Sequence, residues 1–117
     1  MPKYKVANGQ LEVHLSWMER LASLRWGVTV PLSQIKGATV DRGAVPAQLG
    51  IRAPGTGFPR VIAAGTFYKG FEKQFVFWGL GESVVVVELD GHKFRRLILG
   101  TNNPVELEQQ INSSIRN

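Results

Sequence analysis

This chain has 117 residues, of which 44% are hydrophobic and 20% charged, a composition that excludes a disordered chain and predicts one folded domain spanning residues 1–117. It contains no cysteine, which excludes disulfides, thiolate metal sites and cysteine nucleophiles. The net charge of +5 favours anionic partners, although the basic residues are spread thinly from Lys3 to Arg116.

The first third of the chain predicts short strands and one helix. Asn8-Gly9 separates the segments KYKVA and QLEVHLS, and Asn-Gly between alternating segments is a strong hairpin signal. Ser16–Glu19 has the form of a capping box, which predicts a helix of about two turns that ends near Trp26. GVTVPL and KGATVDR predict two more strands, joined by a turn at Pro31–Gln34.

The second half predicts four further strands. Their spacing of about ten residues is typical of a sandwich or barrel. The connections at Lys69-Gly70, Gly79–Gly81 and Asp90-Gly91 are short, so we expect an antiparallel meander. The four segments are RVIAAGTFYK, KQFVFWG, SVVVVELD and FRRLILGT.

A C-terminal helix is predicted from residue 103 onward. Asn103 suits the N-cap, Pro104 the first helical position and Glu106 the third. Leu107 and Ile111 fall on one face together with Ile115. We expect this apolar stripe to pack over the open end of a curled sheet.

Seven or eight short strands followed by one helix is the outline of a pleckstrin-homology-like (PH-like) domain, and the sequence resembles the small bacterial PH-like proteins of unassigned function. The resemblance rests on VPLSQIKGATV (30–40), LGIRAPGTGFPRVIAAGTF (49–67) and VVVVELDGHKFRRLILGTNNP (84–104). It implies a mainly β (α+β) fold: a split barrel of seven to eight antiparallel strands, one short helix in the N-terminal half and a C-terminal capping helix. It also implies a non-catalytic binding or self-assembly module, working as a homo-oligomer or with a protein partner.

Lipid-binding members of this fold grip inositol phosphates with basic residues around the loop between the first two strands. Here that hairpin turns at Asn8-Gly9 beside Glu12, with only Lys3 and Lys5 before it. Phosphoinositide recognition is therefore not expected.

The sequence shows no arrangement of a nucleophile, a base and an orienting third group that would predict catalysis. His14 falls on the polar face of a strand and His92 in a predicted turn beside Gly91, so both are interpreted as surface residues. No metal-ligand spacing occurs, and no recognition helix or RNA-binding aromatic motif accompanies the positive charge. We predict that the protein is not an enzyme, uses no cofactor or metal, and does not bind nucleic acid.

The segment FEKQFVFWGL could form a stacking platform or part of the core. Strand alternation puts Phe75 and Phe77 on one face, which we interpret as the core face. It turns Trp78 outward, where an indole either anchors an interface or is covered by the C-terminal helix. Val84–Val87 places two β-branched residues on each face of its strand, so both faces need cover, and this supports a homo-oligomer.

No segment has the pattern of a signal peptide or of a membrane-spanning helix. The N-terminal stretch lacks a hydrophobic run of roughly 7–15 residues, and Val84–Val87 is far too short to cross a bilayer. We therefore expect a cytoplasmic protein, either soluble or peripheral at the inner face of the membrane.

Gly55-Thr56-Gly57 looks like a phosphate-binding loop, but the segment that follows is a strand by composition, with no helix to supply a dipole. We interpret it as a rigid turn. An anion could still rest near Arg52, Thr56 and Arg60, and the densest basic group contains Lys93, Arg95 and Arg96. These six residues are the candidates for an alternative function, a peripheral membrane or anionic-ligand binding module that contacts anionic lipid.

Overall fold

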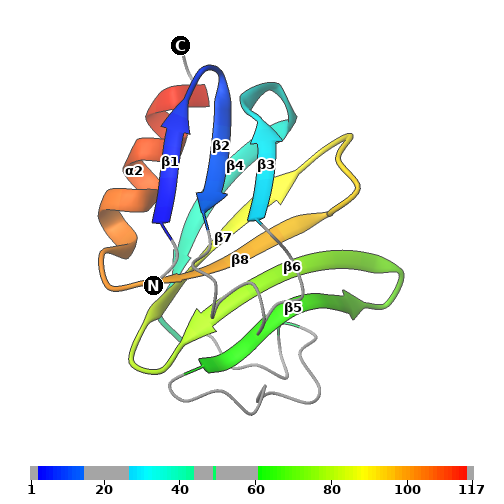
Figure 1. The fold of residues 1–117 in the computed structure, drawn as a ribbon, viewed down its shortest axis with the longest axis vertical. Helices are drawn as coiled ribbons and strands as arrows, with labels where there is room; N and C mark the ends of the chain where they lie inside the picture. Colours follow the sequence, from blue (N-terminus) through cyan, green and yellow to red (C-terminus); the bar gives the residue numbers. More distant parts are fainter. Residues whose placement is uncertain (1–2, 15–26, 44–48, 50–60, 116–117) are drawn as a thin grey trace.

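The computed structural model describes residues 3–14, 27–43, 49 and 61–115. These residues form two sheets that face each other, with one helix along one side (Figure 1). In chain order the elements are β1 (Lys3–Ala7), β2 (Gln10–His14), β3 (Gly27–Pro31), the 3-10 turn η1 (Leu32–Gln34), β4 (Ile35–Asp41), β5 (Val61–Lys69), β6 (Glu72–Gly79), β7 (Ser83–Leu89), β8 (Arg96–Thr101) and α2 (Pro104–Ile115).

The smaller sheet is an antiparallel meander of β1, β2 and β3. Its first hairpin turns where the sequence predicts, because Asn8 and Gly9 both have positive φ, 56° and 73°. A two-residue type I′ turn needs positive φ at both positions, and Asn and Gly adopt it at the lowest cost.

The larger sheet has the order β4-β7-β8-β6-β5, so the predicted meander of the last four strands is wrong. Strand β8 lies between β7 and β6 and pairs with β6 in parallel. Gly100 permits this insertion, because a Cβ there would lie only 3.0 Å from the Cα of Trp78 and 3.1 Å from the backbone oxygen of Phe77. The sheet is therefore mixed, and not purely antiparallel as expected.

The main core lies between the two sheets. Phe75 and Phe77 point into it and are 0% and 3% exposed, which confirms their predicted place. Val85 and Val87 of β7 belong to the same cluster, together with Leu11 and its neighbours on the smaller sheet. Alternation along β6 and β7 therefore identifies the buried face correctly.

A second apolar cluster covers the opposite face of the larger sheet and corrects the prediction for Trp78. The indole is only 6% exposed, and its Nε1 donates to the backbone oxygen of Glu82 at 3.1 Å. Trp78 does point away from the main core, as alternation predicts, but it packs against Val76 and Ile98 of its own sheet, with Leu49 over the cluster. It is therefore not an exposed interface anchor.

The same two clusters account for Val84–Val87. Val84 is fully buried and Val86 half-buried in the second cluster, while the other two valines face the main core. The prediction that both faces need cover is confirmed, and this chain supplies the cover itself. The run therefore no longer supports a homo-oligomer.

Helix α2 begins at Pro104, as the sequence predicts, and it closes one side of the core (Figure 1). Leu107 is 5% exposed and Ile111 is 0% exposed, so the predicted stripe is the buried face. The mainly β fold with a C-terminal helix is confirmed, but the described residues do not form a closed barrel. The helix predicted from Ser16 lies outside the described residues.

No helix among the described residues is long and apolar enough to cross a membrane.

Candidate functional site

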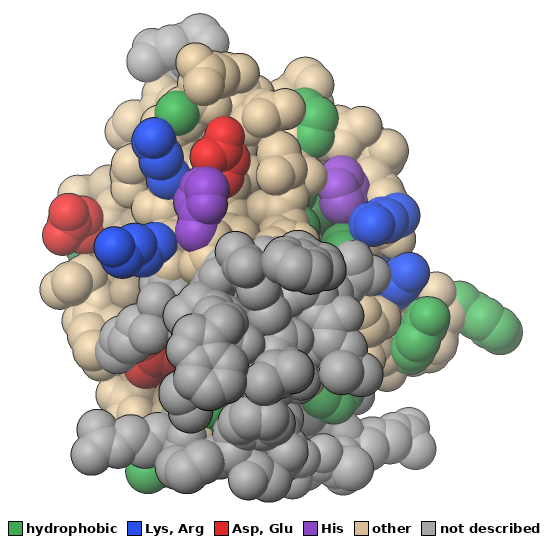
Figure 2. Space-filling model, in the orientation of Figure 1, with side chains coloured by type: hydrophobic (Ala, Val, Ile, Leu, Met, Phe, Trp, Pro, Cys, Tyr) green, Lys and Arg blue, Asp and Glu red, His purple; other side chains and the backbone are tan. Residues whose placement is uncertain are grey.

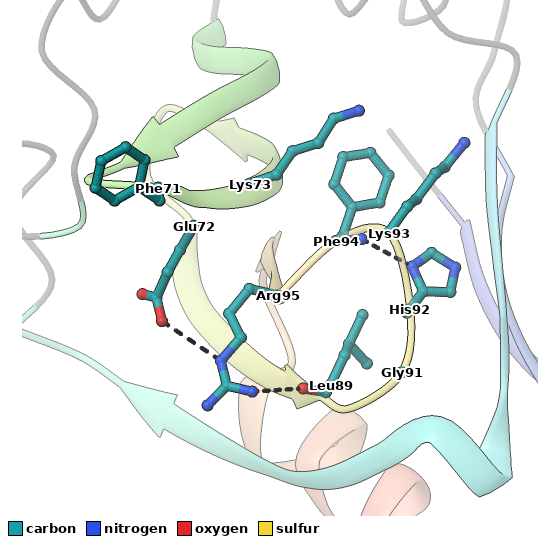
Figure 3. Close-up of a pocket in the computed structure, with 9 residues that line it drawn as sticks. All are labelled: Phe71, Glu72, Lys73, Leu89, Gly91, His92, Lys93, Phe94 and Arg95. Carbon is teal, nitrogen blue, oxygen red and sulfur yellow. Dashed lines mark hydrogen bonds and ion pairs between the residues drawn. The ribbon is translucent and has the colours of Figure 1, made fainter.

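The start of β6 and the β7–β8 connection lie on the side of the larger sheet away from α2 (Figure 1). Residues of these segments line a pocket of about 260 Å³. We call it the edge pocket. It is built from the start of β6, the end of β7 and the connection from β7 to β8 (Figure 3). Its lining residues are Phe71, Glu72, Lys73, Leu89, Gly91, His92, Lys93, Phe94 and Arg95.

Main-chain hydrogen bonds hold the β7–β8 connection in place. The backbone N–H of Arg95 donates to the oxygen of Lys73 at 2.7 Å, and that of Asp90 donates to the oxygen of Gln34 at 2.8 Å. Gly91 has φ of 81°, which glycine adopts far more easily than other residues. The loop is therefore tied to β6 and to η1, so its side chains start from fixed backbone positions.

Phe94 forms the floor of the pocket. Its side chain is 0% exposed and packs against Phe75 of the main core, with ring centres 6.0 Å apart. The ring of His92 also stacks on Phe94, with the two ring centres 5.8 Å apart. Phe94 therefore links the surface pocket to the interior of the protein.

Two lysines lie over this aromatic floor. The Nζ atom of Lys73 is 5.3 Å from the centre of the Phe94 ring, and that of Lys93 is 5.6 Å from it. They come from different elements. In the view of Figure 3 the side chain of Lys73 lies to the left of the ring and that of Lys93 to its right. No carboxylate among the described residues pairs with either ammonium group. A cation over an aromatic face is stabilised by about 0.5–1 kcal/mol at an exposed site, so the ring helps to hold both charges.

His92 joins the loop to the smaller sheet. Its Nδ1 accepts the backbone N–H of Phe94 at 3.1 Å, and the ring also hydrogen-bonds the backbone of Thr29. Burial lowers the pKa of His92 below its ordinary value of 6.5, and the charge of Lys93 acts in the same direction, while the Thr29 bond opposes them. Burial and the neighbouring ammonium group of Lys93 therefore favour the neutral imidazole, and its Nδ1 is held by the backbone of Phe94.

The predicted basic group Lys93, Arg95 and Arg96 is divided by the fold. Lys93 and Arg95 line the edge pocket, whereas Arg96 lies on the opposite face of the sheet, in a second cavity of about 360 Å³. Arg95 donates to the backbone oxygen of Leu89 at 3.2 Å, and its Nε lies 3.5 Å from a carboxylate oxygen of Glu72.

Arg96 is occupied by structural contacts. It donates to Glu72 at 2.9 Å, to Gln74 at 3.1 Å and to Glu88 at 3.3 Å, and thereby joins β6, β7 and β8. The hydrogen bond and the charge of Arg96 hold the pKa of Glu72 below its ordinary value of 4.5. Asp41 also lines this second cavity, so its charges are balanced and it does not form a cationic site.

The other predicted candidates lie elsewhere. Arg52, Thr56 and Arg60 are outside the described residues. Sequence reasoning missed Lys73 and the aromatic floor. The available signal was alternation, because Lys73 shares the face of Phe75 and stands at the start of the strand, where the core face meets solvent.

The polar groups of the edge pocket are mostly cationic. The Nδ1 atom of His92 already accepts a structural hydrogen bond from the backbone N–H of Phe94. No group of three His, Cys, Asp or Glu side chains that could hold a metal occurs in the part of the chain that the structure describes. What the pocket offers is positive charge above an aromatic ring.

No family model matches the chain, and no curated protein or solved structure matches it either.

Proposed function

We propose that this protein is a non-catalytic binding module of PH-like, split-barrel architecture, and that it holds an anionic group in the edge pocket. Two facing sheets with a C-terminal helix along one side support the architecture. The observation that carries the function is the pair of ammonium groups of Lys73 and Lys93, both within 6 Å of the Phe94 ring centre and without a carboxylate partner among the described residues.

The size of the pocket limits the bound group. Its volume of about 260 Å³ lies below the range of roughly 300–1,000 Å³ that is typical of pockets for drug-sized ligands. A phosphate-sized anion would fit, with the rest of its molecule outside. Arg95 at the rim adds a third cation, partly neutralised by Glu72. Because the site is open to water, we expect weak binding, with Kd on the order of 0.1–1 mM at low salt.

Self-association remains a prediction with little support from the fold. Strand β4 is at the edge of the larger sheet, but side chains of α2 bind its outer backbone groups. Asn112 exchanges two hydrogen bonds with Ala38, and Glu108 accepts the backbone N–H of Val40 at 2.8 Å. Pairing of β4 with a second copy would have to displace these contacts. A monomer at all concentrations in size-exclusion chromatography with light scattering would end this second candidate function.

Calorimetric titration with pyrophosphate at low ionic strength tests the anion site. The double variant Lys73→Gln/Lys93→Gln removes both ammonium groups, and we expect its affinity to fall at least about tenfold. The control Lys3→Gln/Lys5→Gln removes the same charge from two exposed positions of β1 and should bind nearly as the wild type does.

Equal losses in the two double variants would show that only net charge matters, and the proposed site would be wrong. Unfolding measured by circular dichroism should show the Lys3/Lys5 control as stable as the wild type. The Lys73/Lys93 variant should stay folded and lose no more than about 1–2 kcal/mol, because it loses two cation–π contacts with Phe94.

A further inference from the structure

The turn between β5 and β6 exposes aromatic side chains beside the edge pocket. Phe71 is 106% exposed and Tyr68 is 60% exposed, and two more large hydrophobic residues among those described, Leu80 and Val105, are exposed elsewhere. We call Tyr68 and Phe71 the aromatic tip. Figure 2 shows hydrophobic side chains projecting from one edge of the molecule, next to basic side chains and a histidine.

The fold itself does not require a phenylalanine at this position. Lys69 pairs with Glu72, so Gly70 and Phe71 are the two residues of the hairpin loop. Gly70 has φ of 63°, whereas Phe71 has negative φ, which is the pattern of a type II′ turn with glycine first. Because glycine and strand pairing set this turn, the exposed ring of Phe71 stabilises nothing that the structure shows within the chain.

Lysines lie beside the aromatic tip, and the neighbouring carboxylate of Glu72 is ion-paired with Arg95 and Arg96. Lys69 lies in the strand end beside it and is exposed, and Lys73 and Lys93 lie in the adjoining pocket. Exposed aromatic rings beside lysines match the boundary of an anionic membrane, where rings enter the headgroup region and ammonium groups meet phosphates. One hydrophobic signal or one charge signal alone gives marginal attachment, and this edge carries both.

We propose that this edge docks on an anionic phospholipid membrane, with Phe71 inserted into the interface, Tyr68 at its surface and a lipid phosphate between Lys73 and Lys93. The proposal rests on the proposed function, because the phosphate occupies the edge pocket. It also differs from the site at the first hairpin that phosphoinositide-binding members of the PH-like fold use.

The shape of the surface favours a membrane over a protein partner. Phe71 projects from a turn, so a protein would need a matching cavity to bury it, and a stable interface needs about 800 Å² from each partner. A bilayer takes up a projecting ring without a preformed cavity. The aromatic tip offers two exposed aromatic side chains, enough for insertion but small for a stable protein interface.

Co-sedimentation with vesicles tests the proposal. The full chain should bind vesicles of equal phosphatidylglycerol and phosphatidylcholine at low salt, and should bind pure phosphatidylcholine at least about tenfold more weakly. Phe71→Ala should weaken binding to the anionic vesicles about tenfold or more. Leu80→Ala is the matched control, since Leu80 is also exposed, at 71%, but lies at the β6–β7 turn. Its binding should stay within about twofold of the wild type.

Two results separate this proposal from the function on which it depends. If pyrophosphate binding requires the two lysines but Phe71→Ala binds vesicles as the wild type does, membrane insertion is wrong and the anion site stands. If vesicle binding requires Phe71 but pyrophosphate binding does not require the lysines, the anion site fails, and with it the phosphate contact proposed here. Equal loss in Phe71→Ala and Leu80→Ala would also overturn docking through this edge.

Discussion

The two ends of the main core are closed by different chemistry. At one end α2 covers the core with Leu107 and Ile111, and its polar side chains bind the backbone of β4. At the other end Phe94 fills the opening, but Lys73 and Lys93 above it have no carboxylate partner among the described residues. Both ends exclude water from the core, but only the second keeps charge available to a ligand.

This difference is the reason for proposing the binding site at the second end. A side chain that satisfies buried backbone groups cannot also bind a partner without leaving those groups unsatisfied, at a cost of about 1–3 kcal/mol for each. Asn112 and Glu108 are committed in this way. The side chains of Lys73 and Lys93 do not bind buried backbone groups, so an anion bound to them disrupts no described hydrogen bond or ion pair.

Truncating the aromatic floor should have the largest effect on stability. Phe94→Ala removes a ring that is 0% exposed and contacts Phe75, so we expect a loss of about 3–5 kcal/mol in the free energy of unfolding. Urea denaturation measures it. Phe71→Ala, which removes the same side chain from a fully exposed position, should change stability by less than about 0.5 kcal/mol. Similar losses in the two variants would mean that Phe94 does not close the core.

A smaller loss is expected at the helix end. Asn112→Ala leaves the backbone N–H and oxygen of Ala38 without their side-chain partner, which should lower the free energy of unfolding by about 1–3 kcal/mol. Ser113→Ala on the exposed side of α2 is the control and should be nearly neutral. If thermal unfolding shows the same midpoint for both variants, water replaces the Asn112 side chain at no cost in free energy. The two ends of the core would then differ less than we propose.

The elements at both ends follow from local signals in the sequence. Asn8-Gly9 specifies a hairpin, and Asn103, Pro104 and Glu106 specify the start of a helix, because turn and cap geometry depends on a few adjacent residues. The order of the strands, by contrast, does not follow from local signals. Short loops predict a meander, but the position of β8 depends on contacts such as the close approach at Gly100, which no local pattern reveals.

The site was only partly predictable for the same reason. Lys93 was a candidate because it lies in a dense basic group, but the fold turns its neighbour Arg96 to the other face and brings Lys73 from a different hairpin. Trp78 alternates outward as expected, yet the outer face is itself covered. Alternation gives the face of a side chain, whereas the cover on that face depends on the tertiary structure.

The smallest effect should come from His92, which fixes the edge-pocket loop. Its pKa in the folded protein lies below 6.5 because of burial, so the unfolded chain binds the proton more readily. The stability it contributes is therefore complete above about pH 6.5 and is lost as the pH falls toward the folded-state pKa. Glu72, whose pKa is also lowered, contributes stability that is complete above about pH 4.5 and is lost only below it, outside the range in which His92 acts.

Urea denaturation at several values between pH 8 and pH 5 checks this effect. The wild type should lose stability over this range, and His92→Asn should lose less. A His14→Asn control, at an exposed position on β2, should follow the wild type. Identical pH profiles for the wild type and His92→Asn would show that the imidazole does not tie the loop to β3.

The most direct test of the difference between the two ends is a map of the backbone amides that respond to an anion. In a ¹H–¹⁵N titration with pyrophosphate at low salt, the largest chemical-shift changes should fall in residues 72–73 and 89–95, with little change in α2. The Lys73→Gln/Lys93→Gln variant should lose those changes. Changes centred on α2 or on the β1–β2 hairpin, or changes that persist in the double variant, would contradict the account.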